Sequence, residues 1–173
     1  MEAALRSELL FTRADYEALP EDLRVELIGG ELLKMASPTL RHQKIAKRVL
    51  LALVQAVGPD RVFFCPVDVP IDNWNVFVPD VVVTAEIPPD ADKVILRPLC
   101  IFEVLSPSTA GRDRLVKAKR YFKVGAKEVW LLDPEAETAE MRTPTGARTF
   151  RRTLRSKAIP GLALPLGPVF KRE

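Results

Sequence analysis

The chain has 173 residues, of which 47% are hydrophobic and 28% are charged. These proportions are ordinary for one soluble globular domain, which we expect to span residues 1–173. No apolar run approaches the roughly 18 to 20 residues that a membrane span needs, and the N-terminus lacks the basic-then-apolar order of a secretory signal. We therefore expect a cytoplasmic protein with no membrane partner.

The distribution of charge and the few histidine and cysteine residues limit the classes of function that this chain can have. The formal net charge is only +3, but basic residues gather in residues 112–127 and 142–157. Such stretches can contact phosphate groups, although they are also typical of a solvated face. His42 is the single histidine, and with Cys65 and Cys100 far apart it leaves too few ligands for a usual zinc site. A histidine-dependent nucleophile would have to use His42 alone, which argues against that chemistry.

The predicted elements begin with a short helix over residues 13–19, capped by Thr12 and ended by Pro20. A hairpin follows, with strands at residues 24–28 and 31–35 joined by Gly29 and Gly30, which tolerate the positive φ of a tight turn. Apolar residues then recur at helical spacing within residues 45–56, which predicts a core-packing helix ended by Gly58.

Strands dominate the remainder of the chain. We expect strands at residues 62–69, 76–84 and 99–105, a second main helix at 112–124, a buried strand at 128–134, and a late hairpin of residues 138–143 and 148–154. This order predicts an α/β or α+β fold, a single domain in which a central mixed sheet is flanked by two main helices.

Two carboxylates stand in strands that are otherwise apolar. With period-2 alternation, Asp80 shares a face with Val78 and Val82, and Glu103 shares one with Leu99, Ile101 and Leu105. An ionised carboxylate in apolar surroundings is normally paired, neutralised or bound to a metal. Asp80 alone could be a turn residue after Pro79, but the pair suggests a shared cation and a hydrolytic site.

Hydrolysis of a phosphodiester calls for charge stabilisation and an activated water, which a divalent metal supplies. Mg²⁺ prefers carboxylate oxygens, carbonyls and waters, so we expect Asp80, Glu103 and the Val104 carbonyl as its ligands. A cation should stabilise the transition state. Lys117 is our candidate, because Asp113, Lys117 and Tyr121 follow i, i+4, i+8 spacing on the helix after the Glu103 strand.

Several short segments, weak individually, together resemble the Uma family of bacterial endonucleases over nearly the whole chain. The segments are Ala18-Leu19-Pro20, residues 26–32, Ser37-Pro38 with His42-Gln43, Pro79-Asp80, residues 103–108, Asp113 with Lys117 and Tyr121, Gly125, and residues 129–134. The resemblance implies the restriction-endonuclease-like fold of the PD-(D/E)XK superfamily, Mg²⁺ with Mn²⁺ able to substitute, and cleavage of nucleic acid, in the first place DNA. By position, it makes Asp80 and Glu103 the metal-binding acids.

The resemblance also assigns a further acid and exposes two departures. Glu31, and with less weight Glu26, resembles the additional N-terminal acid that many superfamily members place beside the metal. The superfamily's usual lysine lies two residues after the second acid, where this chain has Leu105, so Lys117 must serve from the helix. Gly29 replaces an aspartate that is common in the family's hairpin turn.

The sequence leaves other functions open. A catalytically silent nucleic-acid-binding or assembly module could keep the fold after losing the lysine at position 105, and its binding would depend on salt but not on metal. A purely structural oligomeric protein would bind neither metal nor nucleic acid. A homodimer would suit an enzyme that cuts two strands, although no residue pattern demonstrates one.

Overall fold

The computed structural model describes residues 10–87, 89, 94–106 and 112–172, and for residues 112–115 only the backbone. Its elements are α1 (Arg13–Glu17), β1 (Val25–Ile28), β2 (Glu31–Lys34), α2 (Leu40–Val57), a 3-10 turn (Pro59–Arg61), β3 (Val62–Phe64), β4 (Val69–Asp72), β5 (Asn75–Phe77), β6 (Val81–Thr84), β7 (Pro98–Val104), α3 (Arg112–Lys123), β8 (Glu128–Asp133), β9 (Thr138–Thr143), β10 (Gly146–Phe150), β11 (Thr153–Arg155), β12 (Ala163–Pro165) and α4 (Leu166–Phe170).

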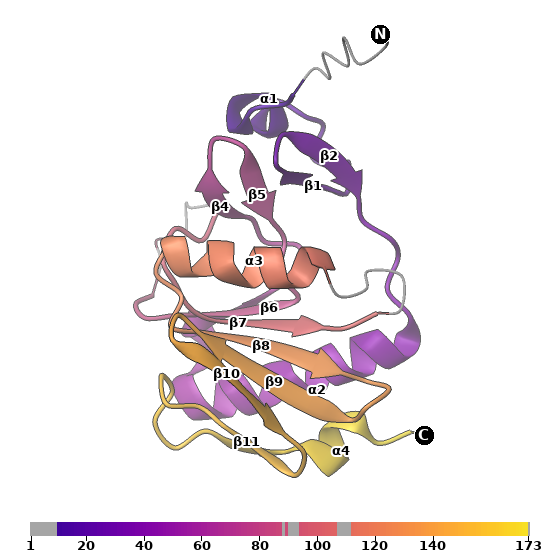
Figure 1. Ribbon diagram of the computed structural model, residues 1–173, viewed down its shortest axis with the longest axis vertical. Helices are drawn as coiled ribbons and strands as arrows, with labels where there is room; N and C mark the ends of the chain where they lie inside the picture. Colours follow the sequence, from indigo (N-terminus) through magenta and orange to yellow (C-terminus); the bar gives the residue numbers. More distant parts are fainter. Residues whose placement is uncertain (1–9, 88, 90–93, 107–111, 173) are drawn as a thin grey trace, which may run out of the picture.

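These strands form two main sheets. A six-stranded sheet has the order β10-β9-β8-β7-β6-β3, and a four-stranded sheet of order β2-β1-β5-β4 stands above it in Figure 1. In the larger sheet β7 and β8 are parallel, while the other neighbours are antiparallel. The predicted mixed sheet flanked by helices is therefore confirmed, although a second sheet, and a short β11-β12 pair, accompany it.

The N-terminal elements follow from local sequence signals. The Thr12 hydroxyl accepts a hydrogen bond from the Asp15 amide while the Asp15 carboxylate accepts one from the Thr12 amide, a capping box that starts α1. The hairpin of β1 and β2 turns at Gly29 and Gly30, whose φ angles are +64° and +87°. Residues with a Cβ rarely adopt two successive positive φ angles, which is why this turn contains two glycines.

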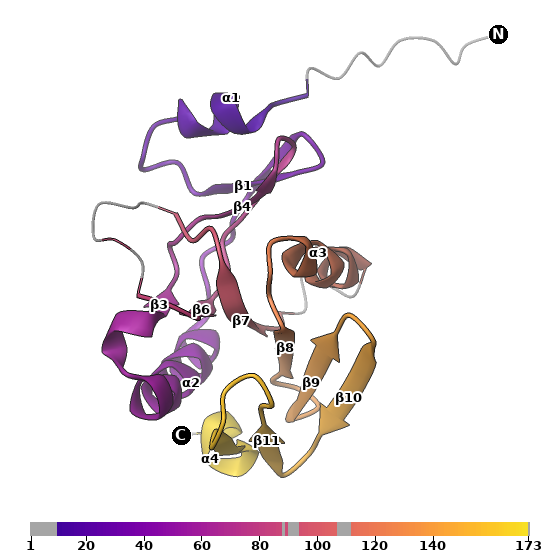
Figure 2. The same ribbon diagram turned by 90° about the vertical axis from the view of Figure 1, so that its left-hand side faces the viewer.

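The two main helices cover opposite faces of the six-stranded sheet (Figure 2). Helix α2 presents Ile45, Val49 and Leu53 to one face, in the helical spacing expected from the sequence. On the other face Ala118 and Tyr121 of α3 join the second buried cluster. Both faces of β6, β7 and β8 are therefore covered by a helix, which explains why the sequences of these strands are nearly continuous apolar runs.

The strands predicted at residues 62–69 and 76–84 are each divided in the structure. The first becomes β3 and β4, and the second becomes β5 in the smaller sheet and β6 in the larger one. In the second case the break falls at Val78, Pro79 and Asp80. Pro79 has no N–H group to continue a ladder, so the chain passes from one sheet to the other at this point.

Glu128 holds the C-terminal segment, which lies beyond the predicted late hairpin. This carboxylate is only 2% exposed. It accepts hydrogen bonds from Trp130 Nε1 at 2.9 Å, Ser156 Oγ at 2.6 Å, and the amides of Lys157 and Ala158 at 2.8 and 3.0 Å. The Cys100 thiol also donates to it, at 4.0 Å. A buried acid with these donors is a structural anchor between β8 and the turn that leads to β12 and α4.

Candidate active site

Asp80 and Glu103 lie opposite each other where β6 meets β7. The antiparallel register pairs Val81 with Phe102 and Val82 with Ile101, so the next position along the ladder brings residue 80 beside residue 103. Val82 and Ile101, which share the alternation of the two acids, pack in the cluster under α3. Leu99 departs from its predicted face, because a bulge between Val83 and Thr84 turns it toward the α2 side.

Both carboxylate oxygens of Asp80 accept hydrogen bonds or contact a ring nitrogen. Oδ2 accepts from the Val104 amide at 2.7 Å, and Oδ1 lies 2.9 Å from Nε2 of His42. The Asp80 side chain is 20% exposed. The Asp80 side chain, and not a backbone carbonyl, is thus the acceptor for the Val104 amide. The break between β5 and β6 thus places an acid at the end of the central strands.

Glu103 is held from the helix on the other side. The hydroxyl of Tyr121 donates to Glu103 Oε1 at 2.9 Å. Burial raises the pKa of Glu103 to about 7, the negative charges of Asp80 and Glu26 add to that rise, and Lys117 and the Tyr121 hydrogen bond oppose it. Burial, and then the negative charges of Glu103, Glu26 and Asp80, raise the pKa of Tyr121 well above its ordinary value, so the phenol remains a hydrogen-bond donor.

Lys117 reaches the same site from α3 and forms an ion pair with Glu26 of β1. Its Nζ donates to Glu26 Oε1 at 2.6 Å and to Oε2 at 2.8 Å, and the ammonium lies 5.3 Å from the centre of the Phe77 ring. Burial opposes the charge, but Glu103 and Glu26 outweigh it and raise the pKa of Lys117. The lysine is therefore cationic at neutral pH, in the environment of both predicted metal-binding acids.

Glu26, rather than Glu31, is the N-terminal acid that the structure brings to this cluster. In the hairpin register Glu26 pairs with Leu33, whereas Glu31 pairs with Ile28 beside the turn. Glu31 therefore lies on the same face but two residues nearer the turn, roughly 7 Å along the strand, and its side chain is exposed. Glu26 also accepts from the Val78 amide at 2.8 Å, at the same sheet-to-sheet break. Of the two N-terminal acids that the resemblance suggested, the structure therefore places Glu26 in contact with Lys117 and Glu31 nearer the turn.

Glu26, to which the resemblance gave less weight than to Glu31, and His42, to which it gave no role, both contact predicted site residues in the structure. Tyr121, which shares the helical spacing of Lys117, binds Glu103 through its hydroxyl, and its ring packs edge-on against Phe77 with 5.3 Å between the ring centres. The only sequence signal for Glu26 and His42 was their place in the family segments, because each contact joins residues far apart in the chain.

The donor set fits a hard divalent cation with protein ligands for only part of its shell. Asp80 and Glu103 are carboxylates close enough for one to raise the pKa of the other, and Val104, whose amide binds Asp80, directly follows Glu103 in the chain. Among the described residues, no three His, Cys, Asp or Glu side chains converge as a complete metal cage. Mg²⁺ commonly binds through one or two carboxylates and keeps several waters. Two acids with a carbonyl therefore fit the ligand preference of Mg²⁺ better than that of Zn²⁺, which favours Cys and His.

The structure thus combines a mixed sheet flanked by helices with acids and a lysine that gather where the central strands end. The sequence profile of the Uma2 family, described as "Putative restriction endonuclease", matches residues 13–167. The chain belongs to this family, which confirms the resemblance inferred from its motifs and makes it a nuclease-class protein, with nucleic acid as the substrate of that class.

Structural comparison supports the fold. The chain is similar to a solved structure described as a putative nuclease belonging to DUF820 from Anabaena variabilis, with a TM-score of 0.80 and 21% sequence identity. The match covers 92% of this chain and 97% of the other. None of the curated proteins matches the sequence significantly. In the part of the chain that the structure describes, no helix combines the length and apolar character of a membrane span.

Proposed function

We propose that this protein is a divalent-metal-dependent nuclease that cleaves phosphodiester bonds in DNA as an endonuclease. The observation that carries the proposal is the meeting of Asp80 and Glu103 at the ends of β6 and β7, with Lys117 in the same electrostatic environment. Asp80, Glu103 and the Val104 carbonyl would hold Mg²⁺ or Mn²⁺. When bound, the metal would stabilise charge on phosphate and lower the pKa of a water.

The remaining chemistry belongs to the chain's own residues. Lys117 holds a proton at Nζ and supplies a fixed positive charge, which favours the negative charge that develops on a phosphoryl group during hydrolysis. Glu26 fixes this ammonium through two hydrogen bonds, and Tyr121 fixes Glu103 through one. Because these partners sit on a strand and a helix packed against the core, the charged groups are oriented before substrate arrives.

The experiment compares Mn²⁺ binding by the wild type and by Asp80→Ala/Glu103→Ala, using electron paramagnetic resonance. A matched control, Asp60→Ala/Glu86→Ala, removes two acids whose side chains are exposed and outside the site. We expect stoichiometric binding in the wild type and the control and its loss in the site variant. Equal Mn²⁺ affinity in all three proteins would contradict the proposed site. A plasmid-nicking assay with added Mg²⁺ or Mn²⁺ then tests cleavage.

One observation favours a second function, a catalytically silent nucleic-acid-binding module. Position 105 carries leucine, and both oxygens of Glu26 engage the Lys117 ammonium, so the lysine has a strong competing partner. This function predicts DNA binding that weakens steeply with salt and is unchanged by a metal chelator. Metal-dependent cleavage that Lys117→Ala abolishes would exclude it.

A further inference from the structure

His42 is the link between helix α2 and the acidic site. The buried residues of α2, Ile45, Val49 and Leu53, pack against the face of the sheet opposite α3. His42, in the first turn of the helix, instead reaches the end of β6, where its Nε2 lies 2.9 Å from Asp80 Oδ1. Its side chain is 17% exposed, so this contact is largely shielded from competing water.

The contact completes the restraint on the Asp80 carboxylate. A carboxylate held through a single oxygen can still rotate about its terminal bond. In this site the Val104 amide holds Oδ2 from strand β7, and His42 holds Oδ1 from helix α2. Restraints from two separate elements fix the plane of the carboxylate and so the direction in which it would meet a cation.

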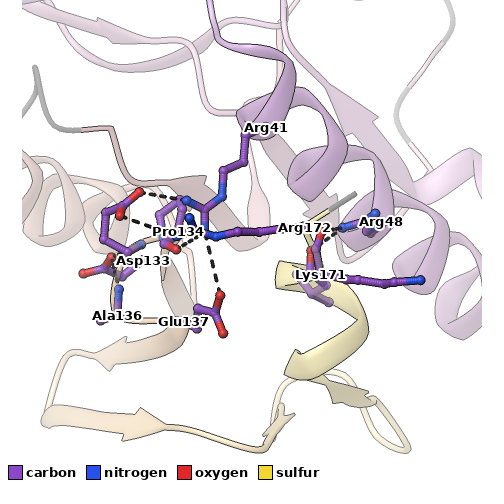
Figure 3. Close-up of polar contacts among 10 residues, drawn as sticks. Arg41, Arg48, Asp133, Pro134, Ala136, Glu137, Lys171 and Arg172 are labelled. Atoms are coloured by element: carbon purple, nitrogen blue, oxygen red, sulfur yellow. Dashed lines mark hydrogen bonds and ion pairs between the residues drawn. The ribbon is translucent and has the colours of Figure 1, made fainter.

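The start of α2 is itself anchored, so the imidazole comes from a fixed support. The Thr39 hydroxyl accepts from the His42 amide at 3.2 Å. The neighbouring Arg41 donates to the Pro134 carbonyl and, at 2.8 Å, to the Glu135 carboxylate, which ties the helix to the turn between β8 and β9 (Figure 3). Two residues in succession are thus attached to the sheet through their side chains.

We propose that His42 is a positioning residue for the nuclease site, one that donates from Nε2 to Asp80 and holds this carboxylate in the orientation in which it binds the divalent cation. The inference rests on the proposed function, because it assumes that Asp80 is a metal ligand. Partners that orient a metal ligand typically contribute 10-fold to 100-fold to metal affinity. The role is distinct from catalysis, since His42 acts through Asp80.

A pair of amide variants isolates the position of the donor. The amide nitrogen of glutamine can occupy the place of Nε2, whereas that of asparagine is one methylene too short. We expect His42→Gln to bind Mn²⁺ within about 3-fold of the wild type and His42→Asn to bind it about 10-fold to 100-fold more weakly. Equal affinities for both variants and the wild type would overturn the proposal, as would equal losses in both while their thermal unfolding remains that of the wild type.

A second measurement needs no metal. His42 is the only histidine, so a long-range ¹H–¹⁵N spectrum of the metal-free protein at pH 8 contains one imidazole pattern. We expect a proton on Nε2 and a change in its shift in Asp80→Ala. A proton on Nδ1 alone would overturn the proposal, because Nε2 could not then donate.

The two failures are distinguishable by the same Mn²⁺ titration. If the wild type and Asp80→Ala/Glu103→Ala bind Mn²⁺ equally, the proposed metal site is refuted, and so is the positioning role of His42. If the double variant loses binding while His42→Asn retains wild-type affinity, only the positioning role is refuted.

Discussion

Replacing Glu103 by glutamine is expected to change how the stability of the metal-free protein depends on pH. Burial first, then repulsion from Asp80 and Glu26, raise the pKa of Glu103 from 4.5 to about 7. The folded state therefore retains a proton that the unfolded chain releases. Since the unfolded chain binds fewer protons between pH 4.5 and 7, stability falls as pH rises through this window. Glutamine has no proton to lose and removes that fall.

The magnitude follows from the same two values. A shift from 4.5 to about 7, at 1.36 kcal/mol for each pKa unit, gives an upper bound of about 3 kcal/mol on the stability lost by the wild type between pH 4.5 and pH 8.5. Glu103 is partly exposed, so solvent screening reduces this figure. Glu103→Gln should therefore gain about 2 to 3 kcal/mol relative to the wild type across that range.

The assay is urea unfolding followed by tryptophan fluorescence in a chelator, at steps between pH 4.5 and 8.5. Glu86→Gln is the matched control, because its side chain is exposed, and its free energy of unfolding should stay parallel to that of the wild type. The difference between Glu103→Gln and the wild type should instead widen with pH. Parallel curves for Glu103→Gln and the wild type would refute the assignment of a raised pKa to this carboxylate.

Three further perturbations test other parts of the site and the fold. At pH 6 the binding of Mn²⁺ should release a proton from Glu103, whose pKa is about 7; calorimetry in buffers of different ionisation enthalpy measures it, and a buffer-independent heat would contradict it. Glu26→Ala leaves the buried Lys117 ammonium without its carboxylate and should cost about 3 to 5 kcal/mol in urea unfolding, whereas Glu26→Leu/Lys117→Met should recover most of that loss. Glu128→Ala leaves the four N–H and O–H donors of this carboxylate without their acceptor and should lower the free energy of unfolding by at least about 3 kcal/mol. A urea midpoint equal to that of the wild type would contradict this prediction.

The elements that local signals specify were predictable from the sequence. Gly29 and Gly30 marked the hairpin, and the helical spacing of Ile45, Val49 and Leu53 marked α2 together with its buried face. Asp80 and Glu103 stood out because apolar strands seldom carry acids. Each of these signals lies within a few residues of the feature it predicts, so no knowledge of the tertiary structure was needed.

The contacts that complete the site join distant parts of the chain. Lys117 binds Glu26 across 91 positions, and His42 meets Asp80 across 38. Such pairs depend on how the two sheets and two helices pack, which periodicity does not determine. The division of the strand at residues 76–84 did have a local signal, because Pro79 cannot donate to a ladder; the apolar residues on either side of it outweighed that signal in the prediction.

The break at Pro79 also explains how a stable core tolerates three acids and a lysine at one point. Where β5 ends and β6 begins, ladder hydrogen bonds are interrupted, and amides near the break need acceptors. Glu26 accepts from Val78, and Asp80 accepts from Val104, so each carboxylate satisfies the backbone and gains a neutral partner in return. Leu105 packs against the apolar cluster beneath α3, while the cation of the site comes from that helix as Lys117. A substitution that restored regular pairing at Pro79 would therefore leave Asp80 opposite Glu103 in the register, but it would remove the need for the Val78 and Val104 amides to bind carboxylates.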